Sequence, residues 1–332
     1  MEQRTLGKTG AKVSVVGLGT WQLGADWGDV AEPVALEVLD IAQRDGVTLF
    51  DTADVYGDGR SERLIAKYLK EVPEQRRPFV ATKMGRRMPQ VESNYSWTNF
   101  VEWTDRSREF LEVDTLDLVQ LHCPPTSVFS NDEVYENLDR LVDEGRIKNY
   151  GVSVETCEEA LEALEHEGVA TIQIIFNIFR RKPLDEVLPL AQSKGVGILA
   201  RVPLASGLLA ARYSHETEFG EDDHRNFNRK GQAFDQGETF SGVDYDDGVR
   251  ASREFAELAR ELGPADATPA QVALRWVIDQ PGVTTVIPGA RSAEQARGNA
   301  AAASLPPLST ELHAALEDLY DRYFRAAIHD RW

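Results

Sequence analysis

Short apolar runs of strand length alternate with longer stretches of helical period, and this alternation occurs eight times along the chain. The runs are continuously apolar, which is typical of parallel strands covered on both faces. Eight rounds in 332 residues, with no break in composition that would mark a linker, predict one (β/α)8 TIM barrel domain spanning 1–332. The expected strands are 13–19, 48–52, 79–83, 116–122, 149–154, 171–177, 197–203 and 284–288.

The stretch 132–146 shows the helical pattern most clearly. Its apolar residues Val134, Leu138 and Leu141 fall at positions i, i+4 and i+7, and Val142 follows at i+8, so they form one stripe that faces the sheet. We expect Asp132 to cap the start of this helix, and a glycine at 145 lies where the helix should end.

An open, doubly wound sheet is the alternative fold for such an alternation. That fold predicts a GxGxxG turn after an early strand. The early pair Gly17 and Gly19 is followed by Thr20, Trp21 and Gln22, so the spacing fails. The closed barrel is therefore favoured, and residues 2–12 read as a small β-hairpin that plugs its floor.

Residues 205–247 form a long, polar, glycine-bearing segment without a clean helical period. Loops of this length in compact domains are usually functional covers or disordered. We expect a mobile loop over the barrel mouth, with His215 and His224 solvated. Its aromatic residues would make the contacts of the closed state: Tyr213, Phe219, Phe227, Phe234 and Phe240.

An extra C-terminal helix is expected at 310–326. Leu312, Leu316, Leu319 and Tyr323 would form its buried stripe, which would leave the last residues, through Trp332, to fold over an edge.

Protonatable side chains stand at the ends of three consecutive expected strands, where catalytic groups of such barrels lie. Asp51 ends the second strand and Tyr56 follows it, while Lys83 and His122 end the third and fourth. Each alone has an ordinary explanation, such as a helix cap, a rim charge or a core histidine. Their coincidence at one end of the barrel predicts a site.

Together these groups can protonate a carbonyl oxygen. A lysine beside a tyrosine favours the phenolate and lowers a pKa that starts near 10 toward the range of a general acid. Asp51 would hold Lys83 charged and in place, Tyr56 would donate the proton, and His122 would orient the carbonyl while a hydride reaches its carbon.

Five segments at the expected strands form recognisable motifs: Val16-Gly17-Leu18-Gly19-Thr20-Trp21, Phe50-Asp51-Thr52-Ala53-Asp54-Val55-Tyr56-Gly57, Ala81-Thr82-Lys83, Asp117-Leu118-Val119-Gln120-Leu121-His122 and Ile287-Pro288-Gly289-Ala290. With these motifs the sequence resembles the aldo-keto reductase family, from residue 4 to about residue 303. The resemblance implies a catalytic tetrad at Asp51, Tyr56, Lys83 and His122, and a nicotinamide cofactor that lies extended across the barrel mouth without a Rossmann turn.

The resemblance also implies a set of cofactor contacts. Ser153, in Gly151-Val152-Ser153, and Gln173 match residues that bond the carboxamide, although Val154 stands where many members have an asparagine. The full expected set is Gly19, Thr20, Trp21, Asp51, Ser153, Gln173, Arg201, Val202, Pro203, Leu204, Ile287, Gly289, Arg291, Gln295 and Asn299.

Arg201 replaces the aromatic residue that stacks on nicotinamide in many family members. Its guanidinium can stack on a ring, reach a phosphate or pair with an acidic rim residue, and the sequence leaves these alternatives open.

Arg291 precedes an expected helix and matches the family's adenosine-phosphate site, where helix-terminal donors would add to its charge. It favours NADPH over NADH. Ala290, Gln295 and Gly298, however, replace polar or charged groups common in NADP-preferring members.

The formal charge of −19 argues against a nucleic-acid or membrane-surface partner. Two scattered cysteines, no leader-like segment and no apolar run of membrane length favour a cytoplasmic protein.

We therefore expect an NADPH-dependent oxidoreductase that reduces a small aldehyde or ketone to an alcohol. The alternative is a slow, cofactor-holding sensor resembling channel-associated β subunits, although the chain has no long N-terminal arm. A metal-dependent barrel enzyme is disfavoured, because His122 is the only histidine among the strand ends.

Overall fold

Eight parallel strands form one sheet in which neighbours in sequence lie side by side. Parallel bridges join Val16 to Val286 and Gly19 to Gly289, so the first and last strands meet and the predicted barrel is confirmed. The computed structural model describes residues 1–24, 30–221 and 223–332. The barrel strands are β3 (Leu18–Gly19), β4 (Leu49–Asp51), β5 (Phe79–Met84), β6 (Leu118–His122), β7 (Tyr150–Ser153), β8 (Val169–Ile175), β9 (Gly197–Arg201) and β10 (Thr285–Val286).

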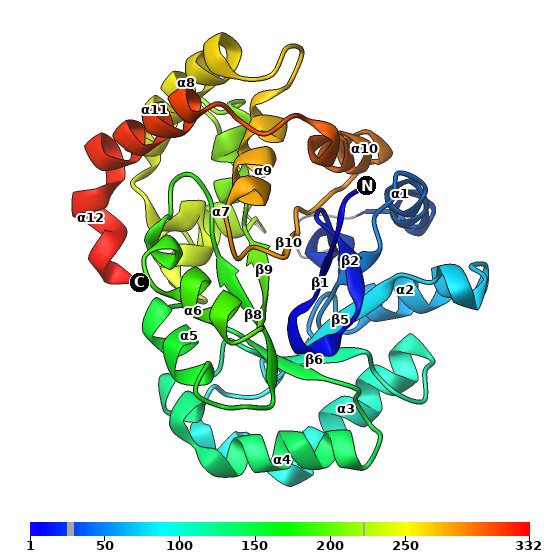
Figure 1. Ribbon diagram of the computed structural model, residues 1–332. Helices are drawn as coiled ribbons and strands as arrows, with labels where there is room; N and C mark the ends of the chain where they lie inside the picture. The colour runs from blue at the N-terminus through cyan, green and yellow to red at the C-terminus, as the bar shows by residue number, and fades with distance from the viewer. Residues whose placement is uncertain (25–29, 222) are drawn as a thin grey trace.

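Helices form an outer ring around these strands (Figure 1). None of the helices in the described ranges is both long and apolar enough to cross a bilayer. The helices that follow the strands are α1 (Glu32–Arg44), α2 (Arg60–Lys70), α3 (Trp97–Leu111), α4 (Asp132–Asp143), α5 (Cys157–Ala163), α6 (Val187–Ser193), α8 (Tyr245–Leu262), α9 (Pro269–Asp279) and α10 (Ala293–Ala301).

Helix α4 buries the predicted stripe, since Val134, Leu138 and Leu141 are all inaccessible to solvent or nearly so. Its cap differs from the expectation. Asn131 is the N-cap and accepts a hydrogen bond from the Glu133 backbone, while Asp132 is the first helical residue. An acidic residue in the first turn still favours the helix, because it faces the positive end of the helix dipole.

The predicted hairpin is present as antiparallel strands β1 (Gln3–Thr5) and β2 (Lys12–Ser14). A Cβ on Gly7 would lie 2.1 Å from the backbone nitrogen of Gly197, so only glycine allows the hairpin turn to rest on the start of β9. The hairpin therefore covers the barrel floor. The expected strand 13–19 was wrong in extent, because its first residues belong to β2 and only Leu18–Gly19 forms β3.

The long segment is more ordered than its composition suggests. It contains the short helices Ala205–Ala210, Gln236–Glu238 and Phe240–Gly242 as well as α7 (His224–Phe227). Tyr213, Phe219 and Phe240 pack against one another, and Phe240 is buried. The segment thus has an aromatic cluster of its own, whereas Phe227 stays exposed.

The C-terminal helix α11 (Thr310–Tyr320) continues through a π-helical turn (Asp321–Arg325) into α12 (Ala326–Ile328). Leu312, Leu316 and Leu319 are buried as expected. Beyond them the π turn shifts the register, so Phe324 is buried and Tyr323 is only half-buried. Trp332 folds back and donates to Asp235 Oδ1 at 3.1 Å, which places the end of the chain against the long segment.

Candidate active site

Four polar side chains meet where strands β4, β5 and β6 end. Asp51 is the last residue of β4, His122 is the last of β6, and Lys83 lies near the end of β5. Lys83 Nζ is 2.5 Å from Asp51 Oδ1 and 3.4 Å from the hydroxyl of Tyr56. The rings of Tyr56 and His122 meet edge to face with centroids 5.9 Å apart. The structure therefore brings together all four residues that the sequence suggested for catalysis.

The carboxylate of Asp51 is held by more partners than the sequence indicated. Gln173 Nε2 donates to Asp51 Oδ2 at 2.7 Å, and Gln120 Nε2 lies 3.4 Å from the same oxygen. Gln120 was not predicted, although it precedes His122 by two residues and so points to the same face of its strand. The orientation of Asp51 thus depends on side chains from three other strands of the barrel, β5, β6 and β8.

Lys83 is charged despite having only 1% of its surface exposed. Burial lowers its pKa, but the Asp51 carboxylate and the Tyr56 hydroxyl outweigh burial, and the net shift is upward. For Tyr56, burial raises the pKa and the charge of Lys83 lowers it. The lysine acts in the expected direction, but the net pKa of the phenol is raised, because burial is the stronger effect.

His122 has a pKa well below its usual value, because it is buried and close to the positive charges of Arg86 and Lys83. The imidazole is therefore neutral and carries one N–H. Its Nδ1 has no hydrogen-bond partner among the described residues. A neutral ring of this kind can donate one hydrogen bond to a carbonyl oxygen.

A cavity of about 560 Å³ opens above these side chains. Tyr56, His122 and Asp51 line it, and Lys83 lies beneath it. Ser153 is not among the lining residues, and its hydroxyl instead lies 3.4 Å from the thiol of Cys123. The other lining residues that the sequence suggested are Gly19, Thr20, Trp21, Gln173, Arg201, Val202, Pro203, Leu204, Ile287, Gly289, Arg291, Gln295 and Asn299.

The same cavity reaches the N-terminus of α10. Arg291 precedes that helix with an exposed side chain, and Ser292 caps it by accepting from the Gln295 backbone. Among the further lining residues that the sequence did not suggest for the site are Arg212, Arg225 and Gln271. The two arginines come from the long segment, where the only sequence signal was a positive charge.

Trp21 joins the strand-end residues to the long segment. Its ring stacks near that of Tyr56 and also contacts those of His224 and Phe234. The expectation of a solvated His224 was wrong, since this ring is buried, and burial lowers its pKa to about 4. His215 is exposed, as expected, and lies 2.8 Å from Asp246.

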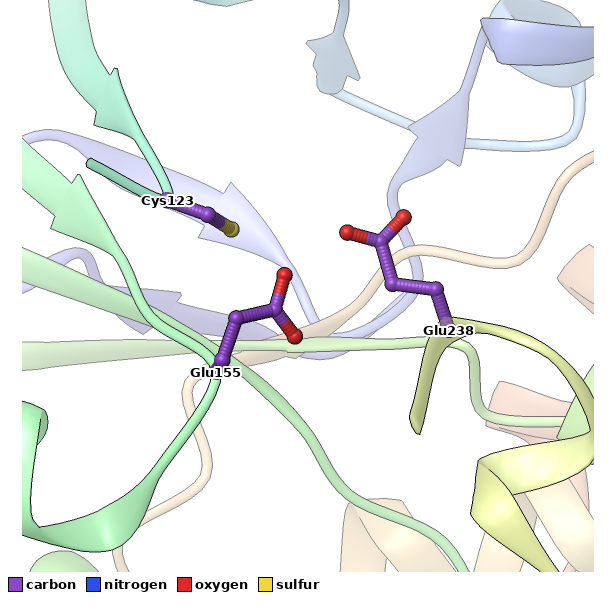
Figure 2. A group of neighbouring side chains, drawn as sticks. All are labelled: Cys123, Glu155 and Glu238. Atoms are coloured by element: carbon purple, nitrogen blue, oxygen red, sulfur yellow. The ribbon is translucent and has the colours of Figure 1, made fainter. Parts of the chain in front are cut away.

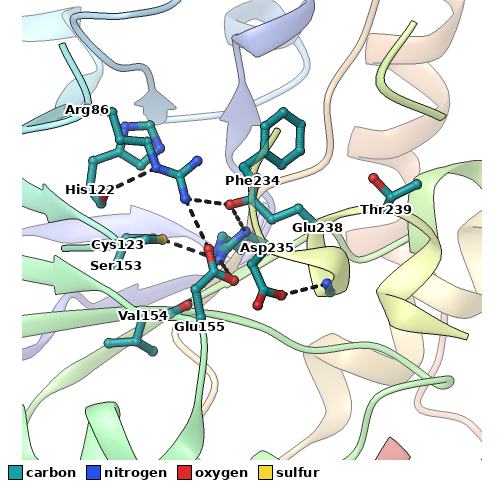
Figure 3. A network of polar contacts seen from close by, with 12 residues as sticks. Arg86, His122, Cys123, Ser153, Val154, Glu155, Phe234, Asp235, Glu238 and Thr239 are labelled. Atoms are coloured by element: carbon teal, nitrogen blue, oxygen red, sulfur yellow. Dashed lines mark hydrogen bonds and ion pairs between the residues drawn. The ribbon is translucent and has the colours of Figure 1, made fainter. Parts of the chain in front are cut away.

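Arg201 belongs to a cluster of largely buried charged side chains, and Figure 3 shows its members Arg86, Glu155 and Glu238 near His122. Its guanidinium contacts Glu155 at 3.1 Å and Glu238 at 3.7 Å. Arg86 contacts the same two carboxylates at 3.0 and 2.7 Å. Among the alternatives for Arg201, the structure shows pairing with acidic residues. We call Arg86, Glu155, Arg201 and Glu238 the charge cluster.

Figure 2 shows Cys123, Glu155 and Glu238 pointing toward one another, with their possible ligand atoms all within 4.8 Å. This donor set does not suit a metal ion. Both carboxylates already bond to guanidinium groups, and burial raises the pKa of the Cys123 thiol to about 12, so the sulfur stays protonated. The two glutamates are therefore the acidic members of an ion-pair cluster with Arg86 and Arg201.

Comparison with known proteins gives consistent matches over most of the chain. Residues 15–321 match the model of the Aldo/keto reductase family. Aldo-keto reductase YhdN of Bacillus subtilis is 32% identical over 89% of this chain and 86% of its own length. A probable voltage-gated potassium channel subunit beta of Arabidopsis thaliana is 29% identical over 94% of each chain.

Solved structures agree in fold. A glycerol dehydrogenase from Gluconobacter oxydans superimposes with a TM-score of 0.76 and 29% identity, covering 94% of this chain and 93% of the other. An aldo-keto reductase from Klebsiella pneumoniae, solved in complex with NADPH, has a TM-score of 0.71 and 26% identity over 96% of each chain.

Proposed function

The chain belongs to the aldo/keto reductase family, and from this premise we propose that it uses NADPH to reduce the carbonyl of a small aldehyde or ketone, with Tyr56 as the proton donor. One observation carries the proposal. Lys83 Nζ is bonded to Asp51 and lies 3.4 Å from the hydroxyl of Tyr56, at the floor of a cavity that His122 also lines. This is the geometry that a general acid for a carbonyl oxygen needs.

The residues around the cavity fit a dinucleotide. Its volume lies within the usual range for small-molecule sites, and it extends from His122 to Arg291. A Cβ on Gly19 would lie 2.9 Å from the carbonyl oxygen of Ile287, so the wall at this point is made of backbone. Gln173 would face the carboxamide, and the backbone near Gly289 would face the adenosine end. When bound, the dinucleotide supplies the hydride.

Two side chains act on the carbonyl oxygen, and two others support them. The hydroxyl of Tyr56 donates its proton to that oxygen, and the N–H of neutral His122 holds the oxygen in place. The charge of Lys83 stabilises the phenolate that remains, and Asp51 keeps Lys83 charged. The proton held by Tyr56 and the hydride together convert the carbonyl to an alcohol.

NADPH is the proposed coenzyme because of the position of Arg291. Its side chain is exposed at the mouth of the cavity and precedes helix α10, whose N-terminal amides and dipole also favour an anion. A 2′-phosphate distinguishes NADPH from NADH and would meet these groups.

The experiment is a panel of small aldehydes and ketones, offered with NADPH and in parallel with NADH. Oxidation is followed by the loss of absorbance of the reduced nicotinamide. We expect turnover with NADPH and several carbonyls. If neither coenzyme is oxidised with any of them, while fluorescence titration shows that NADPH binds, the reductase proposal is contradicted and a cofactor-holding role is favoured.

A further inference from the structure

The long segment crosses the barrel mouth. It leaves the barrel after β9, the seventh strand in the sheet order, and its residue Glu238 reaches Arg86, which follows the third strand, β5. In a closed eight-stranded barrel the third and seventh strands are opposite each other. Residues 228–242, which we call the strap, therefore span the opening above the catalytic side chains.

Glu238 holds the strap to both sides of this opening. Its carboxylate accepts from Arg86 Nη2 at 2.7 Å (Figure 3) and lies 3.7 Å from Arg201 Nη1. Only 6% of the residue is exposed. Burial alone would raise the pKa of Glu238, but Arg86 and Arg201 hold it well below its usual range, so the carboxylate is ionised at neutral pH.

Arg86 and Arg201 connect Glu238 to the catalytic strand ends. Arg86 Nε donates to the backbone oxygen of His122 at 3.2 Å, and Arg201 Nη2 donates to the backbone oxygen of Val154 at 3.0 Å. Glu155 pairs with both arginines. Burial raises the pKa of Glu155, whereas the two arginines lower that of Glu238, so Glu238 is the more acidic carboxyl group of the cluster.

Hydrogen bonds within the strap stabilise its conformation, so the ion pairs of Glu238 position the strap as a whole. Asn228 Oδ1 accepts from the backbone nitrogens of Ala233 and Phe234, both at 2.9 Å, and Asn228 Nδ2 donates to Thr239 Oγ1 at 3.1 Å. Phe234 in turn contacts Trp21. The strap therefore behaves as one small unit that docks at two places.

We propose that Glu238 is a specificity-determining residue: by pairing with Arg86 and Arg201 it latches the strap across the barrel mouth, and the latched strap restricts the catalytic cavity to small carbonyl compounds. Glu238 and Arg201 line the same cavity as Tyr56 and His122, so the latch is a wall of that cavity. The substrate part of this proposal rests on the proposed reductase function.

The latch needs no coenzyme, because all its partners belong to this chain. Removing the charge of Glu238 would take from the two largely buried guanidinium groups the one carboxylate that the strap supplies, and Glu155, which also pairs with both, does not belong to the strap. The strap of such a variant would open, and larger molecules would then reach Tyr56.

The first test is limited proteolysis with trypsin, without coenzyme, of the wild type, Glu238→Gln and the control Glu218→Gln. Glu218 is an exposed glutamate of the same segment. Trypsin cuts after Arg229 and Lys230, which are exposed in the strap but need local opening to enter a protease. We expect cleavage there to be at least about tenfold faster in Glu238→Gln and unchanged in the control.

Arg86→Gln gives an independent check from the other side of the mouth, 152 residues away in the sequence. It should speed the same cleavage after Arg229 and Lys230, although it changes nothing in the strap itself. Cleavage at the wild-type rate in both variants contradicts the latch. Cleavage spread evenly over the barrel also contradicts it, since that pattern means loss of the whole fold.

The second test compares kcat/KM for propanal and for 2-naphthaldehyde. In Glu238→Gln the ratio of the bulky to the small aldehyde should rise about tenfold over the wild type, and in Glu218→Gln it should not change. An active wild type with an unchanged ratio in Glu238→Gln overturns this proposal alone. A wild type that oxidises coenzyme with neither aldehyde, nor with any other carbonyl, overturns the reductase function together with the substrate claim.

Discussion

The two sides of the catalytic cavity are held by different forces. On the floor of the cavity, Lys83 and Asp51 come from adjacent strands, and Gln120 of β6 and Gln173 of β8 support them. On the opposite side, the strap is a surface segment whose link across the mouth depends on Glu238. The floor cannot move without breaking the sheet, whereas the strap can open by breaking ion pairs. We therefore propose that the barrel fixes the chemistry and that the strap, a separable element, controls access to it.

Tyr56→Phe would remove the proposed proton donor on the cavity floor without changing the contacts of the strap. Loss of a general acid typically lowers turnover about 10²–10⁴-fold. The affinity for NADPH, measured by tryptophan fluorescence, should stay near the wild-type value, because the hydroxyl acts in proton transfer. Near-normal kcat in this variant would remove Tyr56 from the mechanism.

Lys83→Met would break the floor's ion pair. Turnover should fall at least about 10²-fold, since Tyr56 loses the charge that lowers its pKa. The free energy of unfolding should fall by roughly 3–5 kcal/mol, because Asp51 is left buried without its partner. Denaturant unfolding and the pH profile of any residual rate provide the measurements. An alkaline limb that stays at its wild-type position would show that Lys83 does not tune Tyr56.

Arg291→Ala tests the outer end of the cavity, far from both the floor and the strap. A charge-assisted contact with a phosphate contributes roughly 1.5–3 kcal/mol, so NADPH should bind about ten- to a hundredfold more weakly. NADH lacks that phosphate and should bind as before. Equal weakening of the two coenzymes would assign Arg291 to the shared part of the dinucleotide or to the fold.

Asp54→Asn probes a buried acid near the cavity floor that, unlike Glu238, bonds to no other side chain among the described residues. Burial, with the nearby Glu62, raises the pKa of Asp54 to about 8. Between about pH 4 and 8 the folded protein therefore holds a proton that the unfolded chain has released, and stability falls as pH rises.

The size of that effect has an upper bound. The free energy of unfolding of the wild type should fall by up to about 1.4 kcal/mol for each pH unit relative to Asp54→Asn, as urea unfolding at pH 5, 6 and 7 would show. Parallel stability curves for the two proteins would mean that Asp54 is ionised in the fold.

Sequence patterns predicted the floor because its residues are tied to strands. Asp51, Lys83 and His122 lie at or near the ends of apolar runs. Once these runs are identified as parallel strands of a barrel, the residues at their ends are expected to lie close together. The expected strand 13–19 was too long, because the apolar pattern of this stretch does not indicate where β2 ends and β3 begins. Tyr323 was misplaced because a π turn leaves no mark in a 3.6-residue period.

The strap could not be predicted in the same way. Glu238 and Arg86 are 152 residues apart, and each looks like an ordinary surface charge in its local sequence. His224 seemed solvated because its neighbours are polar, yet Trp21 and Thr239 cover it in the fold. The burial of such residues depends on packing between segments that are far apart in the sequence. The local pattern of apolar and polar residues does not contain this information.

The pH dependence of kcat tests the account most directly. If Tyr56 donates the proton and His122 stays neutral, the rate of carbonyl reduction should be constant through pH 6.5 and fall only on the alkaline side, as Tyr56, whose pKa burial raises, loses its proton. A wild-type rate that instead changes with an apparent pKa near 6.5, and does so no longer in His122→Gln, would show a titrating imidazole at the centre of the reaction and contradict the assignment of Tyr56 as the acid.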